Sequence, residues 1–231
     1  MNDLAAGIRE IIGEAPQDLV AFYQAADLPV FPESCIRCLP FAEALENSRS
    51  LSQLEIPARL GLWVLDDAND SNPFAYIGKG PCSGMIVHFT HDDDPRIKFA
   101  TLGGFAAALR ERGLGGGDLD EIGEEQVAVP LDPAMRELLA EDSEDASWVI
   151  VLYLSVASEL TQDTKALLAS RDDFVIREAF AAWLVRNPLG DDLALAEQLT
   201  NDSYAQVVRP AKLAMAEIRQ RRRCEEASED G

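Results

Sequence analysis

The sequence contains only two histidines and four cysteines in 231 residues, and this scarcity narrows the chemistry that we expect. Disulfide-stabilised folds need more cysteines over this length, and zinc sites need cysteine or histidine ligands at close, repeated spacing. Cys35 and Cys38 stand alone as a CxxC pair, so the alternatives are a metal or redox site and buried reduced thiols, which we favour. The sequence therefore predicts no metal ion and no cofactor.

Long apolar runs and a basic amino-terminal segment are also missing. No stretch reaches about 18 apolar residues, so we expect no membrane span. The first residues, MNDLAAGIRE, lack the basic-then-apolar pattern of a secretory signal, which favours a cytoplasmic location. A hydrophobic content of 47% nevertheless suffices for a buried core.

Positive charge is scarce, since 20 basic residues face 41 acidic ones and give a net charge of −21. Residues 1–170 hold 11 basic and 29 acidic residues, and residues 111–145 alone hold 12 acidic residues. Such a charge repels nucleic acid and anionic membranes and attracts basic proteins. The alternative is that the acidic side chains serve solubility alone.

Four short apolar stretches predict a β-meander: Leu60–Asp66, Phe74–Ile77, Met85–Thr90 and Ile97–Thr101. Their connections are too short for parallel crossovers, so we expect antiparallel neighbours. A helix over Phe105–Arg112 should close the meander. The pattern predicts an α+β fold, an antiparallel sheet with flanking helices. We expect Trp63 and Tyr76 to pack in its core instead of forming a stacking platform.

Other elements surround this block. We predict helices over residues 2–14, from Pro16, and over Phe41–Asn47 and Asp132–Glu141, with short strands at Cys35–Leu39 and Val127–Leu131. Ala146–Leu160 is apolar on most faces, which indicates a buried helix joining two parts of the chain, although its β-branched residues also fit a strand. We therefore divide the chain into an α+β domain, residues 1–145, and a helical part, residues 146–231.

The carboxy-terminal part is helical throughout. We predict helices over Thr164–Ala169, Phe174–Val185, Leu193–Leu199 and Tyr204–Arg222, separated by the capping residues Asp172/Asp173, Asp191/Asp192 and Asn201/Asp202. FVIREA at residues 174–179 recurs as QVVRPA at residues 206–211. This resembles HEAT-type repeats, whose second helix carries a D…VR..A pattern. Two copies are fewer than the three that usually stand alone, so we expect them to lean on the preceding domain.

The order of motifs LVAFYQAAD, LGLWVLDD, PFAYIG, MIVHFTHDDD and IKFATLGGFAAAL resembles the SUKH superfamily over residues 10–112. Leu19–Tyr23 matches its first helical motif. Phe99–Leu109 matches the last, with LGGFAAAL in place of the usual serine and second phenylalanine, and Asp27–Leu28 stands where the family has an Asn-Gly turn. The resemblance implies a non-catalytic α+β domain of the immunity-protein type, which neutralises a bacterial toxin, often a nuclease.

Catalytic patterns are weak. His88 and His91, with Asp92–Asp94, offer a metal site as an alternative to an ordinary hairpin loop. Asp66 and Asp67 offer an acid–base couple with Asp92–Asp94, as an alternative to solvated turns. No serine or cysteine lies in a nucleophile elbow. We therefore expect the protein not to be an enzyme.

We predict an immunity protein that binds and neutralises a basic toxin, possibly a nuclease, through an acidic surface. The predicted partner-binding residues are Asp66, Asp67, Asp70, Asp92, Asp93, Asp94, Glu124 and Glu125. A regulatory or scaffolding protein that docks partners through the helical repeats is the alternative, and a metal-dependent hydrolase is a third hypothesis. The sequence does not define the oligomeric state.

Overall fold

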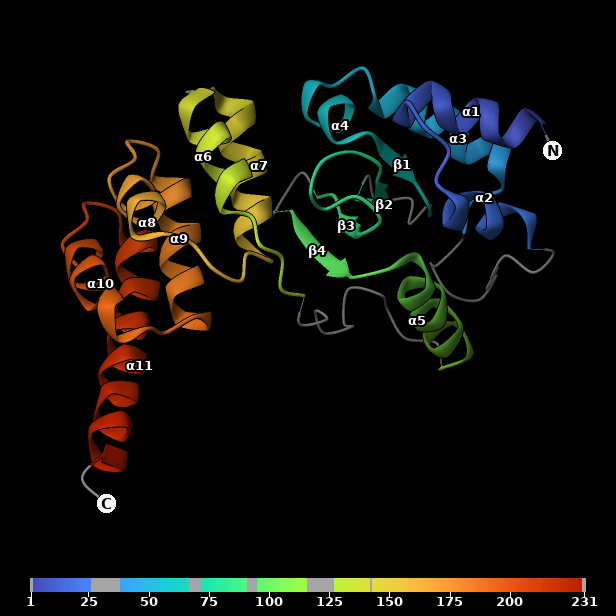
Figure 1. Cartoon of the computed structure of the whole chain (residues 1–231). Coiled ribbons are helices and arrows are strands. Elements are labelled where there is room, and N and C mark those ends of the chain that lie inside the picture. The colour runs from blue at the N-terminus through green and yellow to red at the C-terminus, as the bar shows by residue number, and fades with distance from the viewer. Residues whose placement is uncertain are drawn as a thin grey trace. The chain divides into compact units, whose positions relative to one another are not determined.

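The computed structural model describes residues 2–25, 38–66, 72–90, 95–115, 127–141 and 143–229 (Figure 1). The chain divides into two compact units, Met1–Val127 (unit 1) and Ala128–Gly231 (unit 2). This division precedes the one that we predicted after residue 145. The difference arises because helix α6 (Asp132–Glu141) packs against the two helices that follow it, which places it with the helical part.

Unit 1 is built on a four-stranded antiparallel sheet in the order β1-β2-β3-β4. The strands are β1 (Leu62–Val64), β2 (Phe74–Ile77), β3 (Ile86–His88) and β4 (Arg96–Phe99). The predicted meander and the α+β class are therefore confirmed. Trp63, Tyr76, Ile86 and Phe99 are successive partners across the four strands. All four are buried in the main apolar cluster, because alternate residues of a strand share one face.

Helices flank the sheet. They are α1 (Asn2–Ile12), α2 (Gln17–Gln24), α3 (Phe41–Leu51), α4 (Glu55–Leu60) and α5 (Leu102–Gly115). Helices α1 and α3 lie against β1, and α5 lies against β4 and α2. Their apolar positions, among them Ile8, Leu19 and Phe105, join the sheet residues in one core. Burial of this shared apolar surface holds helices and sheet together.

Helix α4 was not predicted, because the residues before β1 lack a helical apolar period. It ends at Gly61, which has the left-handed conformation (φ 59, ψ 49) that glycine adopts without steric cost. This residue lets the chain leave the helix and enter β1 directly. In the strand predicted at Cys35–Leu39, Cys38 forms an isolated bridge with Asp66, and residues 35–37 lie outside the described residues.

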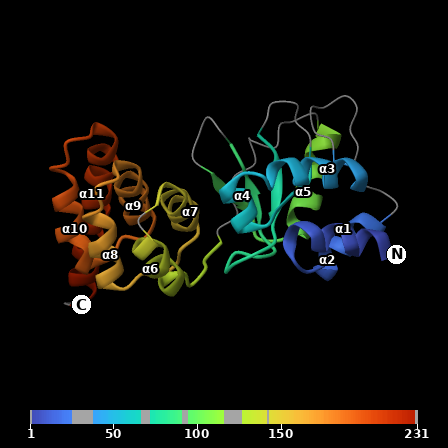
Figure 2. The same ribbon diagram turned by 90° about the horizontal axis from the view of Figure 1, so that it is seen from above.

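Unit 2 consists of three successive helix pairs. The remaining helices are α7 (Glu144–Leu154), α8 (Gln162–Ala169), α9 (Phe174–Arg186), α10 (Leu193–Leu199), which follows the short 3-10 turn η1 (Gly190–Asp192), and α11 (Ala205–Glu229). Figure 2 shows two layers, with α6, α8 and α10 in one and α7, α9 and α11 in the other. The pair α6–α7 supplies a third helix pair beside the two predicted copies.

Helix α7 settles the alternative that the sequence left open, because Ala146–Leu154 is helical and not a strand. The Ser143 hydroxyl caps it by accepting the Ala146 N–H at 3.1 Å. The strand predicted at Val127–Leu131 is limited to one parallel bridge between Val129 and Ala157. In the parts of the chain that the structure describes, no helix combines the length and the apolar character of a membrane span.

Candidate functional site

The strand ends that flank the two predicted acidic turns lie together in unit 1. Val64 in β1 pairs with Ala75, Phe74 in β2 pairs with His88, and His88 in β3 pairs with Arg96. The chain therefore leaves β1, enters β2, leaves β3 and enters β4 at the same end of the sheet. We call this end, with its described residues Asp66, Asn72, Phe74, His88 and Arg96, the acidic-loop end.

Most of the predicted partner-binding residues lie outside the described residues. They are Asp67, Asp70, Asp92, Asp93, Asp94, Glu124 and Glu125. The described strands show only where the segments 67–71 and 91–94 begin and end. The prediction for these seven residues stays a prediction.

Asp66 corrects one part of that prediction. Its side chain is only 2% exposed, and its Oδ1 accepts the Phe74 N–H at 2.6 Å. An aspartate at the end of a strand commonly bonds nearby backbone in this way and fixes a turn. Because this carboxylate is buried and bonded within the chain, Asp66 anchors the start of the acidic segment and does not belong to a partner-binding surface.

His88 lies at the same end of the sheet but is bonded within the fold. Its Nε2 lies 3.1 Å from the Asn72 carbonyl oxygen, and its ring stacks on Phe74 with the centroids 4.5 Å apart. His91 and Asp92–Asp94 lie outside the described residues. Within the described ranges, no three histidine, cysteine or acidic side chains gather as a metal site would require.

The described cysteines of unit 1 are buried thiols. Burial raises the pKa of the Cys38 thiol to about 12, with a further contribution from the negative charge of Asp66. Burial alone raises the pKa of Cys82 to about 12. Because the thiolate is the reactive form, these two thiols are protected from oxidation and exchange near neutral pH. Cys35, the other half of the CxxC pair, lies outside the described residues.

The core role predicted for Trp63 and Tyr76 is confirmed. Trp63 is fully buried, stacks on Phe41 with the centroids 5.5 Å apart, and donates its Nε1–H to the Tyr23 hydroxyl at 3.0 Å. Tyr76 donates its hydroxyl to the Asp18 carboxylate at 3.2 Å. Neither ring is available to stack on a nucleic-acid base or another ligand.

In unit 2, polar contacts join neighbouring helix pairs. Arg177 of α9 binds Asp202, which precedes α11, through two hydrogen bonds, Nε to Oδ2 at 2.6 Å and Nη2 to Oδ1 at 3.2 Å. The Tyr204 ring stacks on Phe174 with the centroids 4.5 Å apart, and the Arg177 guanidinium lies 5.9 Å from the same tyrosine ring. The arginine of the first FVIREA-type motif therefore attaches the next helix pair to its own.

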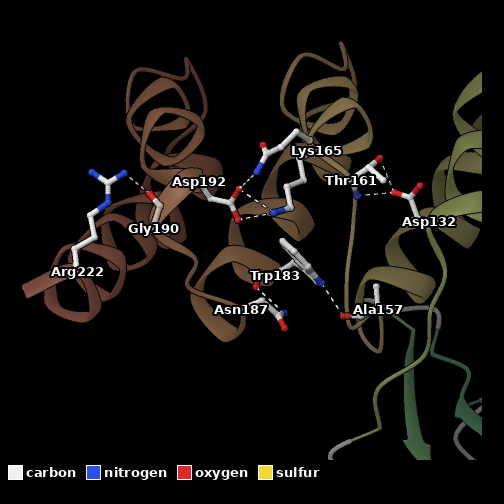
Figure 3. A network of polar contacts seen from close by, with 10 residues as sticks. Asp132, Ala157, Thr161, Lys165, Trp183, Asn187, Gly190, Asp192 and Arg222 are labelled. Carbon is white, nitrogen blue, oxygen red and sulfur yellow. Dashed lines mark hydrogen bonds and ion pairs between the residues drawn. The ribbon is translucent and has the colours of Figure 1, made fainter. Parts of the chain in front are cut away.

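A buried ion pair joins α8 to the start of α10 (Figure 3). The Lys165 Nζ lies 2.9 and 2.8 Å from the two carboxylate oxygens of Asp192, and Gln162 donates to the same carboxylate at 3.0 Å. The Lys165 and Asp192 side chains are 2% and 0% exposed. The Lys165 ammonium also lies 5.4 Å from the centre of the Trp183 ring.

This pair corrects the prediction that Asp192 is a helix-capping residue. Asp192 precedes α10, but its side chain makes no capping hydrogen bond to that helix. Lys165 captures the carboxylate because the lysine lies on the buried face of α8, beside Thr164 and Leu168. A lysine at an apolar position of a helical pattern is the sequence signal for such a pair, since buried lysines are almost always paired.

Further contacts join the helix pairs, and Figure 3 shows those of Asp132, Trp183 and Arg222. The Asp132 carboxylate of α6 accepts the Thr161 N–H at 2.7 Å, next to the start of α8. Trp183 donates its Nε1–H to the Ala157 carbonyl at 2.8 Å. Arg186 donates to Leu154 O, and Arg222 donates to Gly190 O, in each case to a residue 32 positions earlier. Polar contacts thus join the three helix pairs.

No protein-family model, curated protein or solved structure matches the chain in three separate comparisons. The SUKH resemblance of residues 10–112 therefore stays a prediction.

The Arg177–Asp202 pair predicts a pH dependence of stability. The hydrogen bonds from Arg177 hold the pKa of Asp202 below its ordinary value, and burial opposes this only in part. The stabilisation is therefore complete above the unfolded pKa of about 4 and is lost as the pH falls through the lower folded pKa. We expect urea unfolding between about pH 5 and pH 2 to show a shallower loss of stability in Asp202→Asn than in the wild type.

The matched control for this pair is Arg177→Gln, which removes the cation and leaves the carboxyl group. It should also flatten the pH profile, because Asp202 then returns toward its ordinary pKa. An Asp202→Asn profile that runs parallel to the wild type down to the lowest pH would contradict the prediction.

Proposed function

We propose that this chain is an immunity protein that binds a basic protein toxin, possibly a nuclease, and blocks it without catalysis. The observation that carries the proposal is the convergence of the strand ends at the acidic-loop end. Segments 67–71 and 91–94 together contain Asp67, Asp70 and Asp92–Asp94, with no basic residue among them except His91. Both begin and end at this one end of the sheet.

The physical basis is electrostatic complementarity. Five carboxylates in two adjacent segments create a local negative potential, and the net charge of −21 extends it over the chain. A nuclease presents a cationic groove to phosphates, so an acidic protein competes for the same groove. Such complementarity mainly raises the rate of association and selects against acidic partners.

The expected result concerns the association rate with a basic toxin domain encoded next to this chain. Changing Asp67, Asp70 and Asp92–Asp94 to asparagine should slow association about 10-fold or more at low salt. Raising the salt concentration should slow the wild type toward the same rate, because salt screens exposed charges. Stopped-flow or biosensor kinetics measure both effects, and the wild type should also protect cells that express the toxin domain.

The matched control removes five exposed carboxylates that lie outside the acidic segments. It carries Asp3→Asn, Glu14→Gln, Glu46→Gln, Glu55→Gln and Glu137→Gln. The control should associate considerably faster than the variant of the acidic segments. Equal slowing in both variants would show that net charge alone acts, and salt-independent association would rule out steering by these carboxylates.

A second candidate function is a scaffold that docks other proteins through unit 2. The observation that favours it is the stack of three helix pairs, whose final helix carries an exposed hollow. Stacked helix pairs offer extended binding surfaces. This function requires binding at unit 2, whereas the immunity function requires binding at the acidic-loop end of unit 1.

A further inference from the structure

The outer face of α11 corresponds to a face of α9 that is already covered. The repeat offset aligns Ile176, Arg177, Phe180 and Ala181 of α9 with Val208, Arg209, Lys212 and Leu213 of α11. In α9 the three apolar residues are fully buried, and Arg177 is bonded to Asp202 of the following helix pair. At these positions, therefore, α9 contributes apolar packing and one cation to its neighbour.

In α11 the same positions line an open hollow of about 630 Å³. Its lining residues are Asp202, Ser203, Ala205, Val208, Arg209, Lys212 and Leu213. The side chains that pack inward are different ones, Val207, Ala211, Ala214 and Ile218, and these are fully buried. On a helix of 3.6 residues per turn, the hollow lies on the side opposite to this buried row.

Arg209 repeats Arg177 without its acidic partner. Within the described parts of the chain, Arg209 makes neither a hydrogen bond nor an ion pair, and its side chain is exposed. Leu213 beside it is 57% exposed. A repeat face that is open to solvent is normally polar, and Arg209 and Lys212 agree with that pattern. The exposed Leu213 does not agree with it.

The charge of the hollow indicates the chemistry of the partner. Arg209 and Lys212 line it, and its acid, Asp202, is already paired with Arg177, in a chain whose net charge is −21. A carboxylate is therefore the complementary group. A second copy of this chain is disfavoured, because two strongly acidic chains repel each other.

We propose that the outer face of α11 binds an acidic amphipathic helix of another protein. A carboxylate that precedes that helix pairs with Arg209, as Asp202 before α11 pairs with Arg177 inside the stack. Apolar residues of the same helix pack against Val208 and Leu213. This is helix-in-groove recognition with one charged anchor. The inference deepens the scaffold function and does not depend on the acidic segments of unit 1.

The probe is a labelled synthetic peptide of residues 200–218 that carries Arg209→Glu and Lys212→Glu. It keeps Asp202 and the packing row of α11 and is acidic overall. We expect saturable binding to the full chain by fluorescence anisotropy. Arg209→Glu in the protein should weaken this binding at least about 10-fold, because it replaces an ion pair with like charges. The same Arg209→Glu protein should bind better to a peptide that also carries Asp202→Lys.

The matched control is Arg223→Glu in the protein, the same charge reversal at an exposed position further along the same helix. It should leave peptide binding within about two-fold of the wild type, since the control lies outside the hollow. Circular dichroism checks that both variants fold. Absence of saturable binding, or equal loss in both variants, overturns the proposal and leaves α11 as a closing helix.

Analytical ultracentrifugation of the protein alone tests whether a second copy of the chain, and not another protein, binds to the hollow on α11. Self-association that Arg209→Glu abolishes would overturn the proposal in favour of contacts between copies. The asparagine variant of Asp67, Asp70 and Asp92–Asp94 should bind the peptide normally. Failure of this proposal and failure of the immunity function therefore appear in different variants.

Discussion

Asp192→Ala should lower the free energy of unfolding by about 3–5 kcal/mol, because it leaves the Lys165 ammonium buried without its counter-charge. Lys165 is 2% exposed, and its Nζ contacts both carboxylate oxygens. The Trp183 ring, whose centre lies 5.4 Å from the ammonium, cannot neutralise the charge. Urea unfolding followed by circular dichroism measures the loss.

Two further variants test whether the loss of stability comes from the burial of the unpaired charge and not from the loss of any ion pair. The double variant Lys165→Met/Asp192→Leu should recover most of the loss, because it removes both charges and keeps the site filled. Glu197→Ala breaks the exposed pair with Arg219 and should cost less than about 1 kcal/mol. If Asp192→Ala costs no more than Glu197→Ala, water reaches Lys165 and the assigned burial is wrong.

Trp63→Ala should destabilise unit 1 by about 3–5 kcal/mol, since it removes the largest side chain of the cluster and leaves a cavity. The indole stacks on Phe41 and meets the Tyr23 ring edge-on at 5.9 Å between centroids. These contacts tie α2 and α3 to the sheet. The near-ultraviolet circular dichroism spectrum should lose intensity, and urea unfolding gives the free energy.

Trp63→Phe measures how much the hydrogen bond of Trp63 contributes to the stability of unit 1. The variant keeps an aromatic ring but loses the Nε1–H that bonds to Tyr23, so about 1 kcal/mol of its cost belongs to that hydrogen bond. Leu54→Ala, at a position 56% exposed, is the size control and should change stability by less than about 0.5 kcal/mol. A Trp63→Ala loss of similar size to Leu54→Ala would contradict a packed core at this site.

The elements of both units followed from local sequence patterns. Short apolar stretches bounded by turn residues placed β2 at Phe74–Ile77 and predicted β1, β3 and β4 to within a few residues, and their short connections predicted antiparallel pairing. Leu193–Leu199 was also predicted with its observed bounds. Helix α4 was missed, since its end depends on the backbone conformation of Gly61 and not on a repeated apolar period.

Local sequence patterns did not predict contacts between side chains that are far apart in the sequence. Asp66 and Asp192 are both acidic residues next to element ends, and local chemistry predicted solvated turns or caps for both. Each is instead buried, one against the Phe74 backbone and the other against Lys165. Their roles depend on partners that are 8 and 27 positions away, which only the folded chain brings together.

The repeated arginine of unit 2 has a consequence for how such a chain grows. Arg177 pairs with Asp202 at the start of the following helix pair, and Arg209 holds the same position one repeat later. A further copy of this repeat after α11 would bring its own aspartate to Arg209 and would gain this contact without a compensating substitution. Unit 2 can therefore be lengthened by gene duplication, whereas the sheet, with its cross-strand register, has no comparable route to a larger size.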